Sequence, residues 1–573
     1  MRVFQCVIVL LGAFAFATVL AFHNITDGDL WAKLALGASI LRHGHLLRHD
    51  VFAFTPVLQR YIDHEWGAGL VFFAAIDWFG PAGLMLVKMG LAFGALAFSL
   101  GAARRQGCGW ANFDITTIEG TNPSLRHLSP QAGREGLQRP VARCGWNTLF
   151  LLAIPAAACL LPGYIPTVRS HAFTFCLFAA TLLCLEEMRA GRRWAAILLV
   201  LVIAAWTNLH GGFVVGLAVV FFYAAVAVYE KQHGRLVAGT ALVCAAVTFL
   251  NPYGVEFWKY LIPAVLHPRA RIAEWRPLPL FAADQFWGFR IFFALTAATL
   301  VLGRDQITRK RLPGLAVILL TGCLGWRSRR HGPFFAVAAL AFAGPFFAAA
   351  WSKLTSRMAE PLRARGTAAG QNRTISRRFF RSAASPRFDP QLAVVAIYAA
   401  LALYAAAALL PRASLQPLAP VGEDPVREAD ILAAAGVRGN LATPFGWGSY
   451  LAWWLFPNIK ISMDGRYETT YPESTFALNN AFYDKDGDWQ KLIRDYQVDF
   501  VILDLQTERL RPEDLTAHGY ELVWLQDGLS ALLALPEHAA ALHNMASHLP
   551  PTTIDPLDVN HVNLGILQPS GPW

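Results

Sequence analysis

Charged residues are scarce in this sequence, since only 15% of its 573 residues are Asp, Glu, Lys or Arg. Soluble domains typically carry about 25%, and here 55% of the residues are hydrophobic and the mean hydropathy is +0.38. A soluble globule is excluded by this composition. Intrinsic disorder is excluded as well, because disordered chains are poor in apolar residues. The sequence therefore predicts a polytopic α-helical membrane protein.

Cysteine pairs are also lacking, because the eight cysteines stand singly and no Cys/His spacing suits zinc. The first apolar run follows Arg2 but has no small-residue cleavage site after it. This pattern favours a retained membrane anchor over a secretory signal.

Long apolar runs dominate the first 410 residues. A helix rises about 1.5 Å per residue across about 30 Å of hydrocarbon, so runs of some 16 or more residues can enter a bilayer. We count about eleven such runs, which predict a transmembrane domain over residues 1–410. They lie near residues 3–22, 81–103, 146–162, 169–188, 194–209, 212–229, 236–250, 286–303, 312–326, 332–351 and 391–410.

Lys and Arg concentrate in the loops that are cytoplasmic if the N-terminus is cytoplasmic, which favours that orientation. An odd number of spans then places the acidic tail after residue 410 on the outside. We expect a multi-pass protein of the bacterial inner membrane with a periplasmic C-terminal domain. The net charge of +10 belongs to loops at the membrane surface, so no nucleic acid is implied.

Several segments depart from the pattern of simple spans. A long first outer loop covers 23–80, with an interfacial helix expected at 67–79 because that run is too short to span. Residues 104–145, in which a Cys-Gly-Trp sequence begins at Cys108 and again at Cys144, indicate an inserted cytoplasmic loop, an ordinary long loop being the alternative. Residues 352–390 have the composition of a cytoplasmic linker.

The tail alternates short apolar strands with helical patterns, which predicts a small α/β domain over 411–540 followed by a loose end at 541–573. The expected strands are 439–443, 459–463, 498–503 and 529–535, and the expected helix is 489–496.

Two acids flank a glycine directly after the first span, as Asp27-Gly28-Asp29. Such carboxylates can share a divalent cation, Mg or Mn, or one can act as a base while the other orients it. Alternatively, Asp27 caps the helix that follows. Lys33 lies one turn after Asp29 and is expected to pair with it, which favours Asp27 as the catalytic acid.

Further polar residues gather at the outer ends of other spans. Residues with the chemistry to bind a substrate are Asp63, His64, Glu65, His210, Tyr253, Glu274, Arg329, Arg330 and His331. The basic residues at 329–331 break the rule that outer loops are poor in Arg, and an arginine fork suits phosphate oxygens. The alternative is that these arginines extend toward lipid headgroups.

These motifs together resemble the GT-C superfamily of membrane glycosyltransferases, in a bacterial branch with a C-terminal outer domain. The resemblance rests on Asp27-Gly28-Asp29-Leu30-Trp31, Asp63-His64-Glu65-Trp66, Asn208-Leu209-His210-Gly211-Gly212, Asn251-Pro252-Tyr253-Gly254 and Arg330-His331-Gly332-Pro333. In the tail it extends to Gly446-Trp447-Gly448-Ser449-Tyr450-Leu451 and Met463-Asp464-Gly465-Arg466-Tyr467.

The resemblance implies transfer of a sugar from a polyprenyl-phosphate carrier to a glycan, lipid or protein acceptor at the outer membrane face. By position, Asp27 or Asp29 would be the catalytic group or metal ligand, and Arg329 and Arg330 would contact the lipid phosphate. A transporter or a non-catalytic envelope-assembly protein is the alternative. A transporter, however, should place charges at mid-depth or show repeated span patterns, and the sequence shows neither.

Overall fold

Long apolar helices form most of the computed structural model. It describes residues 2–107 apart from 23, 25 and 45, residues 153–354 apart from 162–168, 267–272 and 282–285, a few residues between 396 and 415, and residues 424–549. Most of the expected insert at 104–145, the linker at 352–390 and the last span therefore lie outside the described residues. The described helices before the tail include α1 (Arg2–Ala21), α2 (Gly28–His43), α3 (Trp66–Arg105), α5 (Ala153–Ala158), α6 (His171–Arg189), α7 (Trp194–Leu209), α8 (Phe213–Tyr229), α9 (Gly234–Val247), α10 (Val255–Leu266), α11 (Trp287–Leu302), α12 (Leu312–Arg327) and α13 (Gly332–Phe342).

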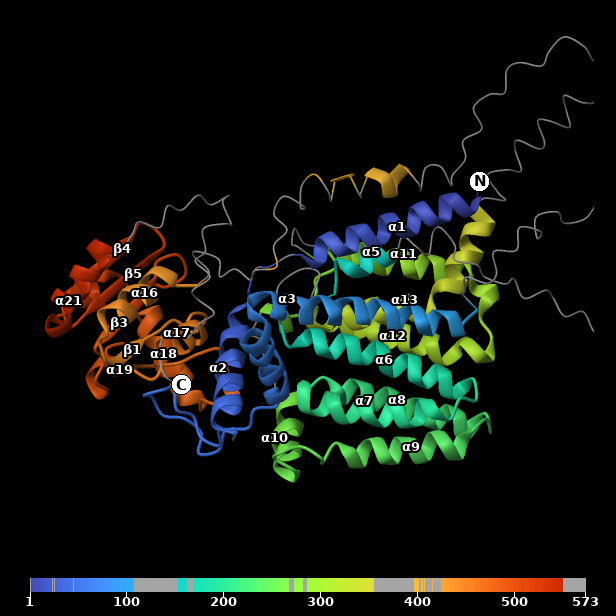
Figure 1. The fold of residues 1–573 in the computed structure, drawn as a ribbon, viewed down its shortest axis with the longest axis horizontal. Helices are drawn as coiled ribbons and strands as arrows, with labels where there is room; N and C mark the ends of the chain where they lie inside the picture. Colours follow the sequence, from blue (N-terminus) through green and yellow to red (C-terminus); the bar gives the residue numbers. More distant parts are fainter. Residues whose placement is uncertain are drawn as a thin grey trace, which may run out of the picture.

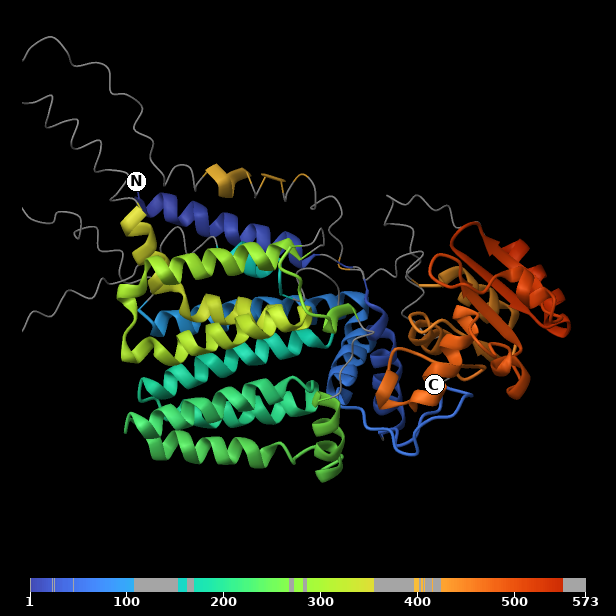
Figure 2. The same ribbon diagram turned by 180° about the vertical axis from the view of Figure 1, so that it is seen from behind.

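Most of these helices run side by side as a bundle, and α2, the first part of α3 and α10 lie across one end of it (Figure 1). The view from behind shows the same arrangement, with the tail beyond that end (Figure 2). Among the described helices, α3 and α6 are long and apolar enough to cross a membrane, and 329–342 with 344–354, bent by 68°, make a third candidate. The other apolar helices are shorter, so the expected number of spans stays a prediction.

Local sequence determines how the first outer loop folds. Gly80 divides α3 because it adopts a φ of 67°, and Pro81, which has no N–H, begins the second part. The segment expected to be an interfacial helix is thus the first part of α3. It packs closely on α2: a Cβ at Gly37 would lie 2.1 Å from the carbonyl oxygen of Gly69, so only glycine fits there.

The tail folds as an α/β domain around a five-stranded sheet of order β2-β1-β3-β5-β4. Its strands β1, β2 and β3 are parallel, whereas β5 is antiparallel to β3 and β4. Its elements are α16 (Val426–Ala435), β1 (Gly439–Ala442), α17 (Gly448–Leu455), β2 (Ile459–Ile461), α18 (Glu473–Asp484), α19 (Lys491–Asp495), β3 (Phe500–Asp504), α20 (Pro512–Thr516), β4 (Glu521–Gln526), β5 (Ser530–Ala534) and α21 (Pro536–His548).

Two features of the tail differ from expectation. Strand β4 was not expected, and its burial pattern is irregular because it pairs at the sheet edge with a register shift between Leu522 and Trp524. The expected loose end at 541–573 begins too early, since α21 continues to His548 and buries Ala539 and Leu542. Residues 550–573 lie outside the described residues.

A short segment of the first outer loop pairs with the edge strand β2 of this sheet. Ala53 forms a parallel bridge with Ile461 of β2, and the backbone N–H of Phe54 donates to the Ile461 carbonyl at 3.0 Å. Arg466 lies between Asp464 of the tail and Asp50 of the loop, with an Nη1 to Asp50 Oδ1 distance of 2.6 Å. The tail is therefore docked on the loop that carries the acidic motif.

Candidate active site

Asp27 has two roles in the structure. It is the N-cap of α2, and its Oδ1 accepts a hydrogen bond from the backbone N–H of Asp29 at 3.1 Å. Its Oδ2 lies 2.6 Å from Nε of Arg169. The expected capping role is thus confirmed, because a carboxylate at a helix N-terminus satisfies free N–H groups.

Asp29 is held more loosely, one residue into α2. Its Oδ2 lies 3.7 Å from Nη2 of Arg169, and its side chain is 48% exposed. Desolvation in the packed site and the charge of Asp27 raise the pKa of Asp29 to about 6, although Arg169 and Arg330 act in the opposite direction. A carboxyl group with such a pKa can exchange protons near neutral pH.

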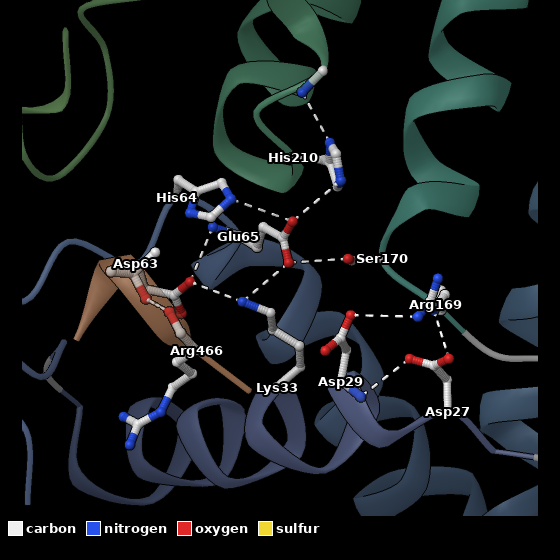
Figure 3. Close-up of polar contacts among 12 residues, drawn as sticks. Asp27, Asp29, Lys33, Asp63, His64, Glu65, Arg169, Ser170, His210 and Arg466 are labelled. Atoms are coloured by element: carbon white, nitrogen blue, oxygen red, sulfur yellow. Dashed lines mark hydrogen bonds and ion pairs between the residues drawn. The ribbon is translucent and has the colours of Figure 1, made fainter. Parts of the chain in front are cut away.

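Arg169, just before α6, contacts both aspartates of the acidic motif (Figure 3). Besides both loop aspartates, its guanidinium contacts Glu274 through Nη1. Burial alone would lower the pKa of Arg169, but the three carboxylates raise it well above its usual value. Arg330 adds a second cation, with its Nη1 3.4 Å from Oε2 of Glu274. The two arginines lower the pKa of Glu274 against the effect of its burial.

Lys33 corrects the sequence-based expectation. Its Nζ lies 3.3 Å from Oδ1 of Asp63 and 3.0 Å from Oε2 of Glu65, so it pairs with these acids and not with Asp29 (Figure 3). The reason is the close contact of α2 with α3, which brings the residues before α3 onto this face of α2. Burial would raise the pKa of Glu65, but the charge of Lys33 holds it well below its usual value.

His210 adds a neutral imidazole to the same cluster. Its Nδ1 accepts from the backbone N–H of Gly212 at 2.8 Å, so the proton belongs on Nε2, which lies 3.1 Å from Oε1 of Glu65. Burial lowers the pKa of His210 to about 3. His64 approaches the same Glu65 oxygen at 3.4 Å.

The two clusters are joined by neighbouring residues. Ser170 donates its hydroxyl to Oε2 of Glu65 at 3.0 Å, while Arg169 holds the acidic motif. Tyr253 supports the second cluster, because its hydroxyl accepts from the backbone N–H of Asp63 at 3.2 Å. Burial raises the pKa of Tyr253 to about 12.

The basic residues between α12 and α13 separate into two environments. Arg330 is joined to the acidic groups through Glu274, and its guanidinium also lies 5.1 Å from the ring centre of Trp275. Arg329 lies over the ring of Phe286 at 4.6 Å, and the His331 ring packs edge-on against Trp275 at 5.8 Å. Arg330 is thus the member that the structure places at the acidic site.

Sequence reasoning missed Arg169, Ser170 and His171. All three were assigned to the outer end of the span expected at 169–188, so the apolar run concealed them. His171 is buried with its ring centre 4.6 Å from that of His210, and neither ring nitrogen has a hydrogen-bond partner among the described residues. An arginine at the outer end of a span was the available signal, as it was for Arg330.

The tail also reaches the acidic motif. A Cβ at Gly465 would lie 3.4 Å from Oδ1 of Asp29 and 3.4 Å from Oγ of Ser449, and a Cβ at Gly28 would lie 3.4 Å from the carbonyl oxygen of Gly446. Trp31 donates its ring N–H to Asp424 at 3.2 Å. The tail therefore forms one wall beside Asp29.

No family model and no curated protein matches the sequence. Solved structures do match. The archaeal oligosaccharyltransferase AglB from Archaeoglobus fulgidus, in complex with an inhibitory peptide and a dolichol-phosphate, is similar with a TM-score of 0.53 and 11% identity over 88% of this chain and 70% of that one. The Archaeoglobus fulgidus oligosaccharyltransferase tethered to an acceptor peptide gives 0.50 and 12% over 88% and 69%. ArnT from Cupriavidus metallidurans bound to undecaprenyl phosphate gives 0.47 and 13% over 94% and 98%.

The apolar helices and the extramembrane α/β domain define a helical membrane protein with a docked C-terminal domain. Its fold is similar to that of the two Archaeoglobus fulgidus oligosaccharyltransferase structures, in agreement with the fold that the loop motifs led us to expect.

Proposed function

We propose that the protein is a membrane glycosyltransferase that moves a sugar from a polyprenyl-phosphate carrier to an acceptor at the outer face of the bacterial inner membrane. The observation that carries this proposal is Asp29, a partly exposed carboxyl group with a pKa raised to about 6, beside Arg169 and Arg330 at one end of a membrane bundle. The similar AglB structure holds a dolichol-phosphate, which supports a carrier of this chemical class.

In the proposed reaction, the ionised carboxylate of Asp29 accepts a proton from the acceptor hydroxyl or amine. The acceptor atom then forms a bond to the anomeric carbon of the sugar, while the bond between that carbon and the phosphate oxygen breaks. The polyprenyl phosphate leaves with an added negative charge, and Arg330 and Arg169 are placed to stabilise it. Fixed positive groups aimed at developing charge are a common large contribution to catalysis.

The second cluster has a supporting role in this proposal. Lys33 and His210 are buried and both lie against the buried Glu65, so the three residues fix the position of α2 relative to α3 and to the turn after α7. Catalytic groups held on such a rigid support keep their geometry when substrate binds.

A transfer assay tests the proposal. Purified protein in lipid nanodiscs is incubated with a panel of polyprenyl-phosphate-linked sugars and an envelope extract as acceptor, and release of the free carrier phosphate is measured by mass spectrometry. We expect carrier release from at least one donor, and we expect Asp29→Asn to abolish it. The matched control is Asp488→Asn, which changes an exposed aspartate in the tail.

No carrier release from any donor would contradict the proposal. Equal release by the wild type and Asp29→Asn would also contradict the assignment of the base. The first result would favour the alternative of a transporter or an envelope-assembly protein, whereas the second would leave transfer intact and assign the base to another residue.

A further inference from the structure

The acidic motif already holds a cation. The Arg169 guanidinium contacts Asp27 through Nε at 2.6 Å, Asp29 through Nη2 at 3.7 Å and Glu274 through Nη1. These carboxylates come from different segments, the first outer loop and the loop before α11. A metal ion commonly connects separate segments through carboxylates in this way.

A divalent ion between Asp27 and Asp29 does not fit this donor set. Mg²⁺ requires carboxylate oxygens at about 2.1 Å in near-octahedral geometry. Both oxygens of Asp27 are engaged by N–H groups, Oδ1 by the Asp29 backbone and Oδ2 by Nε of Arg169. An ion at this position would also lie beside the permanent positive charge of Arg169, which is repulsive at any working pH.

We propose that the Arg169 guanidinium is the resident cation of the acidic site and takes the place of a divalent metal ion between Asp27 and Asp29. Whether the unliganded protein binds a divalent metal ion can be measured without any transfer activity. Only the consequence for catalysis rests on the proposed glycosyltransferase function.

The geometry gives the guanidinium a property that a bound metal would lack. A metal ligated by Asp29 would keep its carboxylate ionised and occupied, whereas Nη2 at 3.7 Å lies beyond hydrogen-bond distance. Asp29 therefore stays available to accept a proton. Asp27 instead is held by both of its oxygens and fixes the position of Arg169.

Binding of Mn²⁺, measured by electron paramagnetic resonance on the purified full chain without substrate, tests the proposal directly. We expect the wild type and Asp27→Asn to bind equally little Mn²⁺. Saturable binding of one Mn²⁺ by the wild type that Asp27→Asn abolishes would overturn the proposal.

The variant Arg169→Ala tests whether removing the guanidinium allows a metal ion to bind in its place. Removing the guanidinium leaves the carboxylates of Asp27, Asp29 and Glu274 without their shared cation. We expect Mn²⁺ affinity to rise by on the order of tenfold or more, because a unit positive charge a few ångströms from the ion is removed. The gain should be lost again in the double variant Arg169→Ala/Asp27→Asn.

Arg169→Lys is the matched control, since it keeps the positive charge and should gain no Mn²⁺ binding. All variants are compared only as monodisperse species in gel filtration, and the wild-type measurement stands even if Arg169→Ala fails to fold. A monodisperse Arg169→Ala that gains no Mn²⁺ binding would overturn the claim that these carboxylates form a cation site.

A second readout uses transfer activity. We expect wild-type carrier release to be unchanged by EDTA. Loss of activity in EDTA that Mg²⁺ or Mn²⁺ restores would overturn this inference while leaving the glycosyltransferase function intact. No transfer at all, with no Mn²⁺ bound by the wild type, would contradict the proposed function and leave the cation assignment supported.

Discussion

Lys33 Nζ lies 3.0 Å from Oε2 of Glu65, in a buried contact between α2 and the residue that precedes α3. Because the lysine is committed to this pair, it does not neutralise Asp29 one turn earlier. The reason for preferring Asp27 as the base therefore no longer holds. Asp27 is engaged by both oxygens, and Asp29 is the acid with an exposed carboxylate and a raised pKa.

The first prediction separates the two acids. Asp29→Asn keeps the shape of the side chain and removes its basicity, so turnover should fall by about 10² or more while donor affinity changes little. Asp27→Asn should weaken the contact with Arg169 and reduce thermal stability more than Asp29→Asn does. Carrier release and thermal unfolding are measured on both variants. A greater loss of turnover in Asp27→Asn than in Asp29→Asn would restore Asp27 as the base.

The pH profile provides the second prediction. A base must be ionised, so kcat/KM should decline as the pH falls through about 6, the pKa of Asp29. The stability effect has the opposite sign. The folded pKa exceeds the ordinary 3.8, so the protonated form favours folding, and this contribution is lost as the pH rises from 3.8 through about 6. Asp29→Asn should therefore gain thermal stability relative to the wild type over that range. A pH-independent stability difference would argue against the raised pKa.

Local patterns in the sequence predicted much of the fold. The apolar run at 194–209 is helix α7 as expected, and four of the five strands lie at the short apolar runs where they were expected. Strand β4 was missed because its apolar run is only four residues long, Leu522 to Leu525, between the polar residues Glu521 and Gln526. Helix α21 was missed because it is rich in His and Ala and buries only Ala539 and Leu542.

The sequence predicted most residues of the site, but it did not predict which of them form ion pairs with one another. Asp27, Asp29, Glu274 and Arg330 were expected at one surface, and the structure brings them together. The ion pairs of Lys33 and Arg169 depend on contacts between segments far apart in the sequence. Helical spacing placed Lys33 beside Asp29, but the close approach of Gly37 and Gly69 brought stronger partners to it.

The third prediction concerns the buried cluster. Lys33→Met should leave Asp63 and Glu65 as uncompensated buried charges, a loss of about 3–5 kcal/mol in the free energy of unfolding. The measurement is thermal unfolding in detergent. The matched control is Lys485→Met, which removes an exposed partner of Asp514 and should have little effect. The double variant Lys33→Met/Glu65→Gln should recover part of the loss. Equal stability of Lys33→Met and Lys485→Met would contradict the buried network.

The fourth prediction concerns orientation. The tail and the acidic site lie at the same end of the bundle (Figure 1), so they face the same side of the membrane. Alkaline phosphatase fused after His548 should be active, because that enzyme folds only after export, and a cytoplasmic reporter at the same place should be silent. The reverse result would place the site in the cytoplasm and contradict transfer at the outer face.

The last prediction tests whether the tail is part of the site. Arg466 is buried between Asp464 and Asp50, and its guanidinium also lies over the Phe52 ring at 5.0 Å. Arg466→Ala leaves two buried carboxylates without their cation, so the tail should detach from the first outer loop. We expect faster proteolysis of the chain between the membrane domain and the tail.

Transfer activity should fall together with protease resistance in Arg466→Ala, because Gly465 and Ser449 would no longer lie beside Asp29. Arg494→Ala is the matched control: its partner Asp488 is exposed on the same domain, so neither property should change. Arg466→Lys keeps the charge and should retain part of both. If Arg466→Ala is cleaved faster yet transfers sugar at the wild-type rate, the tail is a separate module and the wall that it forms beside Asp29 has no role in catalysis.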